Sequence, residues 1–204
     1  MLIFEIICYY INKESLKEKM EIIMKYILLL RGINISGKNK IAMSKLKENL
    51  EDLGYQNVIT YLNSGNVVLE AGDASKDKIA KEVYEMIKDK FQLIIPVYII
   101  EVDELKELLD NHPSWWCTEN KEIYNNIIFI IPPCTYKEVY SLLGEPNNEL
   151  EKIKQYKNNI FWSYDLKEHR KTKWWSKTAS SDIRDMITIR TANTVKKLLE
   201  ICLK

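Results

Sequence analysis

The sequence predicts an α+β fold in which two units with the element order β-α-β-β-α-β follow one another and a helix ends the chain. The first observation is that the strand and helix patterns of residues 25–102 recur over residues 126–190. The second is that the most apolar strands are the first and fourth elements of each copy, where this topology has its central strands. The third is that short polar turns join the middle strands of each copy, so the sheets should be antiparallel.

Each element of the first copy has its own pattern. Residues 26–31 form a continuous apolar run, typical of a strand buried on both faces. Leucines at helical spacing follow Ser44, a good N-cap, and stop before Gly54, a good residue for ending a helix. The remaining expected elements are strands 57–62 and 66–71, joined by a tight hairpin, helix 75–91 and strand 96–102.

The second copy follows a linking helix and loop over residues 103–125 and opens with an apolar strand, 126–131. Thr135 and Glu138 form a capping box for a helix that Gly144 closes. The remaining expected elements are strands 151–157 and 159–165 around Asn158-Asn159, a weak polar helix or loop over 169–183, strand 186–190 and a last helix with Val195, Leu198, Leu199 and Cys202.

This order is that of ferredoxin-like domains. We therefore expect one such domain over residues 24–102 and a second, with the C-terminal helix, over 126–204, separated by the link 103–125. A single mixed sheet with a coincidental order is the alternative. Residues 1–23 are either an extension, including one created by a start assigned too early, or a packed extra strand or helix.

Composition limits the classes of function. Lys and Arg total 30 and Asp and Glu 29, so the net charge is +1 and no global nucleic-acid signature exists. The four cysteines form no C-x-x-C pair and there are two histidines, so we expect free thiols in a reducing, cytoplasmic location and neither metal nor cofactor. The apolar run at the N-terminus is too short to span a bilayer, so no membrane association is expected.

The stretch after the first strand predicts an anion site. Arg31 offers a planar fork suited to phosphate or carboxylate, and two glycines would let backbone N–H groups converge. A nucleotide-binding P-loop is disfavoured because Asn39 stands where that motif has Ser or Thr. The alternative is a glycine-dependent turn that packs the two domains together. The candidate residues are Arg31, Gly32, Asn34, Gly37, Lys38 and Lys40.

A hairpin should lie beside this loop. The first two strands of a split β-α-β unit run in the same direction, so the loop after the first and the hairpin after the second share one edge of the sheet. We therefore expect residues 31–40 and 63–66 to be neighbours in space. The simpler interpretation is that a hairpin needs these residue types. The candidates here are Tyr61, Ser64, Gly65 and Asn66.

Two further groups lie near the C-terminus. Arg190 ends a strand, and Asn193 or Thr194 either caps the last helix or joins Arg190 in a second anion site. Residues 165–177 combine basic side chains with Trp174 and Trp175, a pattern suited to a phosphate backbone with stacked bases. A solvated loop with buried tryptophans is the alternative. Lys177 is the candidate ligand residue from this run.

Three segments carry a family resemblance: LLRGINISGKNKIAM from residue 29, TYLNSGNVVLE from residue 60 and MITIRTANTVKKLLEI from residue 186. They resemble the bacterial family named domain of unknown function 1697, over residues 24–203. The resemblance implies an α+β, two-domain ferredoxin-like fold and makes residues 1–23 unusual. Thr191-Ala192 departs from an Asn-Trp pair in the family pattern. The family implies no reaction.

Three functions remain open. The first is a binding module for a phosphate-bearing ligand, a nucleotide or nucleic acid, at a groove between the domains. The second is an enzyme acting on a small anionic metabolite, with Arg31 orienting the substrate and Lys38 or Lys177 as the acid or electrostatic group. The third is a structural or partner-binding protein. No carboxylate pair or Cys-His spacing indicates catalysis, and the sequence leaves the oligomeric state open.

Overall fold

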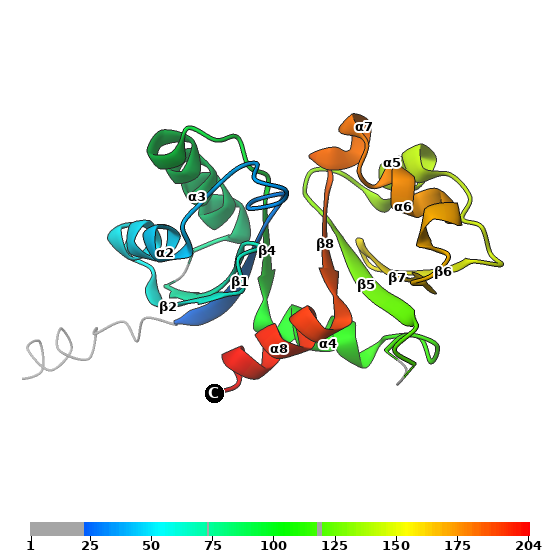
Figure 1. Cartoon of the computed structure of the whole chain (residues 1–204). Coiled ribbons are helices and arrows are strands. Elements are labelled where there is room, and N and C mark those ends of the chain that lie inside the picture. The colour runs from blue at the N-terminus through cyan, green and yellow to red at the C-terminus, as the bar shows by residue number, and fades with distance from the viewer. Residues whose placement is uncertain (1–22, 73, 118–119) are drawn as a thin grey trace, which may run out of the picture.

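The computed structural model describes residues 23–72, 74–117 and 120–204, and the expectations for residues 1–22 lie outside this part. It contains two four-stranded antiparallel sheets, one on each side of the molecule in Figure 1, and a C-terminal helix. No helix in the described ranges is long and apolar enough to cross a bilayer.

The first sheet has the strand order β2-β3-β1-β4, and every neighbouring pair is antiparallel. The helices α2 and α3 cover one of its faces (Figure 1). The hairpin expected between residues 62 and 66 joins β2 to β3. The elements are β1 (Met24–Leu30), α2 (Met43–Asp52), β2 (Gln56–Tyr61), β3 (Asn66–Ala71), α3 (Lys76–Phe91) and β4 (Val97–Glu101).

The second sheet repeats this arrangement with the order β6-β7-β5-β8, after the linking helix α4 (Val102–Asp110). The segment 169–183, expected as a weak helix or loop, holds three short helices. The elements are β5 (Ile123–Ile130), α5 (Tyr136–Leu143), β6 (Glu151–Tyr156), β7 (Asn159–Asp165), η1 (His169–Lys171), α6 (Lys173–Lys177), α7 (Ser181–Arg184), β8 (Ile187–Thr191) and α8 (Ala192–Cys202).

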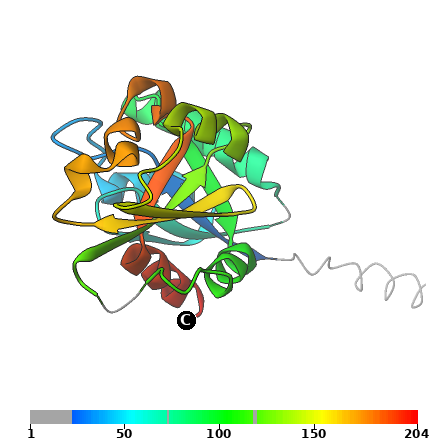
Figure 2. The same ribbon diagram turned by 90° about the vertical axis from the view of Figure 1, so that its right-hand side faces the viewer.

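The central strands are buried on both faces, as their apolar runs indicate. Along β1, Leu28 and Leu30 pack under α2 and α3, whereas Ile27 and Leu29 face the second unit. Across that interface Phe129 of β5 belongs to the same buried cluster. The helices α4 and α8 pack against each other and close one end of this shared core (Figures 1 and 2). One hydrophobic core therefore joins the two units.

Two expected helix caps are wrong. Ser44 lies inside α2, whose N-cap is Ala42, a residue without a capping side chain. The helix starts earlier because Asn34 holds the backbone of the buried Ile41 immediately before it. At α8 the cap is Thr191, whose hydroxyl accepts from the N–H of Thr194 at 3.3 Å, so neither Asn193 nor Thr194 is the cap.

The basic and aromatic run is largely engaged by the protein itself. Trp174 is fully buried, and its indole N–H donates to the carbonyl oxygen of Gly144 at 2.8 Å. Trp175 is 41% exposed and packs edge-on against His169. The buried carboxylate of Glu151 accepts from the backbone N–H groups of Lys173 and Trp174, at the start of α6. The burial of Trp174 fits the solvated-loop interpretation of this run, whereas the exposed Trp175 does not.

We predict that the two units unfold in one transition, because the shared core would expose apolar surface of both sheets if either unit unfolded alone. All five tryptophans lie between residues 115 and 175, so their fluorescence reports on the second unit and the link, whereas far-UV circular dichroism reports on the whole chain. The urea transitions followed by the two signals should coincide. Two separate midpoints would show that each unit is stable alone.

Candidate functional site

The loop after β1 and the hairpin after β2 are in contact, as expected from the topology. The amide of Asn34 donates to the carbonyl oxygens of Ile41 at 2.8 Å and Asn63 at 2.9 Å and accepts from the N–H of Ile41 at 2.9 Å. The N–H of Leu30 donates to the carbonyl oxygen of Gly65 at 2.8 Å. Asn34 therefore positions the loop against the hairpin, and its polar atoms are already engaged by protein groups.

The loop projects a small turn into solvent. The N–H of Lys38 donates to the carbonyl oxygen of Ile35 at 2.9 Å, and the turn residues Ser36 and Gly37 have φ values of 49° and 78°. The side-chain amide of Asn39 donates to the carbonyl oxygen of Gly32 at 3.0 Å and fixes the base of the turn. These bonds define the direction in which the neighbouring lysines leave the backbone.

Lys38 and Lys40 are both exposed on this loop. In the described part of the chain, neither ammonium group has a carboxylate within ion-pair distance. Most other lysines in α2 and α3 have a Glu partner on the same helix or a neighbouring one, for example Lys45 with Glu48 and Lys76 with Glu104. The loop therefore carries two positive charges that remain available to an anion.

A hollow of about 480 Å³ lies where this loop meets the start of α2. Ala42 has no side chain that could cap the helix, so no capping side chain accepts a hydrogen bond from the first backbone N–H groups of α2. Such a helix start carries partial positive charge and suits an anion. The hollow is lined by Asn34, Gly37, Lys40, Ile41, Ala42, Met43 and Asn63.

Arg190 joins the two units instead of lining this hollow. Its side chain is 8% exposed, and burial lowers its pKa to about 10, with the Arg31 guanidinium acting in the same direction. Its Nε donates to Oδ1 of Asn66. Its two terminal nitrogens donate to neutral oxygens within 3.3 Å: those of Thr188, Ile189, Leu30, Ser64 and Gly65. All its nitrogens are therefore engaged by protein acceptors.

Arg31 also reaches across the interface. It is half-buried, and its guanidinium donates to the carbonyl oxygen of Thr178 at 3.0 Å. Burial lowers its pKa; Asp185 opposes this shift and Arg184 adds to it. The two guanidinium groups of the candidate set thus both connect the loop side of the first unit to the second unit.

The other candidates lie apart from the hollow. The ammonium of Lys177 donates to the carbonyl oxygens of Leu142 and Leu143 at 3.1 and 3.0 Å, at the C-terminal end of α5. Tyr61 packs against the shared core, close enough to Lys197 of α8 to interact electrostatically. Asn193 and Thr194 lie in the first turn of α8, after β8. The structure thus brings together the loop and hairpin members of the predicted set and packs Arg190 against the hairpin, whereas Lys177 is bonded elsewhere.

Sequence reasoning missed Ala42, because the plausible cap Ser44 concealed the fact that the helix starts without one. It also missed Asn63 as part of the hollow, where its carbonyl oxygen receives the Asn34 amide. The signal for Asn63 was present, since it belongs to the hairpin expected beside the loop. No signal in the sequence indicates the start of α2, which depends on the tertiary contact between Asn34 and Ile41.

No metal site is found among the described residues, where no three His, Cys, Asp or Glu side chains gather closely enough to hold an ion. Cys117, Cys134 and Cys202 are free thiols, and burial raises the pKa of Cys202 to about 11. A thiol with such a pKa is a poor nucleophile at neutral pH.

The fold and the glycine-rich loop define a mixed α/β protein with a polar hollow at one rim of its first sheet. The chain belongs to the family described as "Protein of unknown function (DUF1697)", whose model matches residues 23–161. This confirms the resemblance seen in the sequence, although the C-terminal segment from residue 186 lies outside the matched range.

Among solved structures, the chain is similar to the conserved bacterial protein SP0830 from Streptococcus pneumoniae, with a TM-score of 0.75 and 26% sequence identity. The similarity covers 88% of this chain and 98% of that one. No protein with a curated description matched the chain.

Proposed function

We propose that the protein is a binding module for a phosphate-bearing ligand and that the phosphate binds at the start of α2. The observation that carries this proposal is the combination of an uncapped helix start with Lys38 and Lys40, two exposed lysines without a carboxylate partner among the described residues. A phosphate group uses several donors at once and gains most where they converge.

A compact ligand, such as a nucleotide or a phosphorylated metabolite, fits this site better than nucleic acid does. The run 165–177 would be the second contact of a nucleic-acid strand, but Lys167 and Lys171 are paired with Glu122 and Glu168. Trp174 of the same run is buried and cannot stack on a base. The proposal places this binding in the cytoplasm, in keeping with the free thiols expected from the sequence.

Changing both Lys38 and Lys40 to Ala should weaken phosphate binding by about tenfold or more, since hydrogen bonds to charged groups contribute about 1.5–3 kcal/mol each. The melting temperature without ligand should stay nearly the same, because both side chains are exposed. The measurement is a thermal-shift titration with pyrophosphate, followed by a panel of nucleotides and sugar phosphates, since a ligand of the native state raises the melting temperature.

The matched control is the double substitution Lys106→Ala and Lys196→Ala, which removes the same charge from exposed positions of α4 and α8. It should leave the titration unchanged. Equal loss of binding in both variants would mean that net charge, and not this site, attracts the anion. Full binding by the Lys38/Lys40 variant would contradict the proposal.

A structural role, holding the two units together, is the second candidate function, and it rests on Arg190. Its guanidinium is saturated by protein oxygens, and the acceptors come from both units. The enzyme hypothesis receives no comparable support, because Arg31 and Lys177, two of its proposed groups, are directed at backbone oxygens of Thr178 and of α5.

We also propose that each unit is of the ferredoxin-like type, with boundaries at residues 24–102 and 126–204 and residues 103–125 as the link. The support is the strand order, in which the first and third strands of each unit are central and the second and fourth lie at the edges. The buried cluster shared by the two units supports their being structural units packed on one core.

A further inference from the structure

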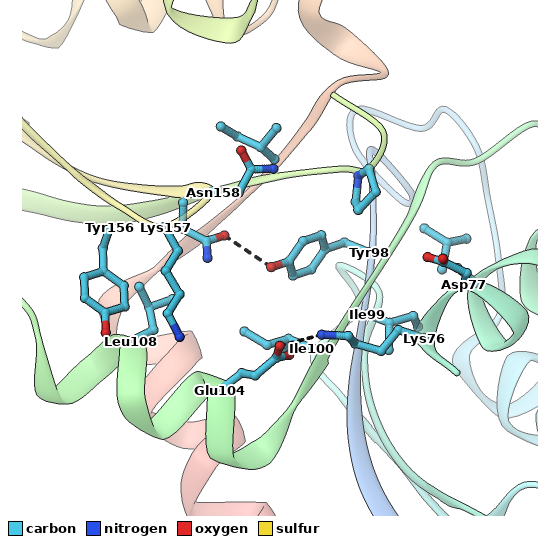
Figure 3. Close-up of a pocket in the computed structure, with 15 residues that line it drawn as sticks. Lys76, Asp77, Tyr98, Ile99, Ile100, Glu104, Leu108, Tyr156, Lys157 and Asn158 are labelled. Atoms are coloured by element: carbon cyan, nitrogen blue, oxygen red, sulfur yellow. Dashed lines mark hydrogen bonds and ion pairs between the residues drawn. The ribbon is translucent and has the colours of Figure 1, made fainter. Parts of the chain in front are cut away.

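A second cavity, of about 400 Å³, lies between the two units and shares no lining residue with the hollow at α2 (Figure 3). The first unit contributes β4 and the start of α3, and the second contributes the end of β5 and the turn between β6 and β7. The linking helix α4 lies along one side. Clefts at the junction of two units are common positions for small-molecule sites, and this volume is in their usual range.

The inner part of the cavity holds one pair of neutral polar groups. The hydroxyl of Tyr98 donates to Oδ1 of Asn159 at 3.2 Å, and the two side chains are 9% and 8% exposed. Burial first, and the nearby Glu104 carboxylate second, raise the pKa of Tyr98, so this phenol stays neutral at physiological pH. The surrounding wall is apolar, with Val97, Ile130 and Pro132 among its members.

This pair has unused hydrogen-bonding capacity. Within the described residues, the side-chain nitrogen of Asn159 donates to no protein acceptor, although the residue is more than nine-tenths buried and lines the cavity. The Tyr98 oxygen uses its hydrogen for Asn159 and can still accept one bond. The two groups therefore present one donor and one acceptor side by side to any molecule in the cavity.

The rim carries both signs of charge. Lys76 is paired with Glu104 at 2.5 Å (Figure 3). Lys157, on the opposite side, is paired with Glu107 at 2.5 Å. Asp77 adds an exposed carboxylate. An anionic or cationic ligand would each meet a like charge here, so the rim favours an uncharged molecule.

We propose that this cavity binds an uncharged heteroaromatic ring whose edge has a carbonyl oxygen next to an N–H group, as in the lactam edge of a nucleobase. The carbonyl would accept from the Asn159 amide, the ring N–H would donate to the Tyr98 oxygen, and the ring faces would contact the apolar wall. This site is separate from the phosphate site at α2, so the proposal does not depend on that one.

The test is isothermal titration of the full chain with uridine, thymidine and inosine, three uncharged nucleosides that carry the lactam edge. At least one should bind at millimolar concentration or below. Its N-methylated form, 3-methyluridine, 3-methylthymidine or 1-methylinosine, should bind about tenfold more weakly or not at all, because the methyl group replaces the hydrogen offered to Tyr98. Absence of binding by all three, or equal binding of the methylated form, would overturn the proposal.

Substitution of the protein gives a second readout. Tyr98→Phe keeps the ring that packs against Phe129 and should weaken nucleoside binding by about tenfold. The control is Tyr156→Phe, which removes a hydroxyl from the same cavity lining, but one that donates to Glu107 at 2.8 Å. It should leave binding unchanged. Equal effects of the two variants, or none from Tyr98→Phe, would contradict the assignment.

The Lys38/Lys40 variant separates the two sites. It should lose pyrophosphate binding and keep the binding of the uncharged nucleoside. Loss of both ligands by this variant would mean that no independent cavity site exists and would overturn the proposal. Failure of pyrophosphate to bind the wild-type protein, with the nucleoside still bound, would count only against the phosphate site.

Discussion

Replacing Arg190 by methionine is expected to lower the free energy of unfolding by about 3 kcal/mol or more. Methionine keeps most of the apolar stem but removes every donor, so oxygens of Asn66, Leu30 and Ser64 lose their partner. Relief of the buried charge offsets part of this cost, because burial already disfavours the ionised guanidinium. The measurement is urea unfolding of the variant and the wild-type protein, followed by circular dichroism.

The same experiment needs a control for the loss of one positive charge. Arg170→Met provides it, since Arg170 is exposed in the short helix η1. Its stability should stay within about 0.5 kcal/mol of the wild type. If the Arg190 variant were equally stable, the guanidinium would not be what holds the two units together, and a ligand-binding role for it would regain support.

Replacing Gly65 by alanine is the second large expected effect, with a loss of about 2–5 kcal/mol. The residue has φ of +74°, a conformation that costs an L-residue about 1–2 kcal/mol. The added Cβ would lie 2.6 Å from Cβ of Leu30 and 3.0 Å from Cδ1 of Ile33. Overpacking of this kind costs about a further 1–3 kcal/mol, because Cβ of Leu30 can move only with the central strand.

Gly37→Ala separates the two causes. Gly37 has a similar φ of +78°, but nothing lies within 4 Å of the position that a Cβ would take. The free energy of unfolding of this variant should fall only by the cost of the backbone conformation. Urea unfolding of the two variants measures the difference between their losses. Equal losses of stability in the two variants would show that the hairpin does not press against β1 at Gly65. They would weaken the claim that the loop after β1 and the hairpin after β2 are packed together.

Much of the fold could be predicted because its signals are local. The apolar run of β1 correctly indicated burial on both faces, and the capping box at Thr135 and Glu138 is present as expected. The contact between the loop and the hairpin followed from topology alone. These features depend on residues close in sequence, or on a connection rule that holds for the whole class of fold.

The roles of the site residues could not be predicted in the same way, because they depend on distant partners. Four of the six acceptors of Arg190 lie on segments more than 120 residues earlier in the chain. The pair of Tyr98 and Asn159 forms across the two units, and the sequence assigns Asn159 a role only in the turn between two strands. A basic side chain at a strand end looks the same in sequence whether it binds a ligand or a carbonyl oxygen.

The most direct test of the central claim is a nuclear magnetic resonance titration of the ¹⁵N-labelled full chain with pyrophosphate. The account predicts that the largest amide shifts map to residues 37–45, at the loop and the first turn of α2, and that they disappear in the Lys38/Lys40 variant. Shifts centred on Arg31 and Arg190, or no saturable shifts at all, would contradict a phosphate site at the start of α2.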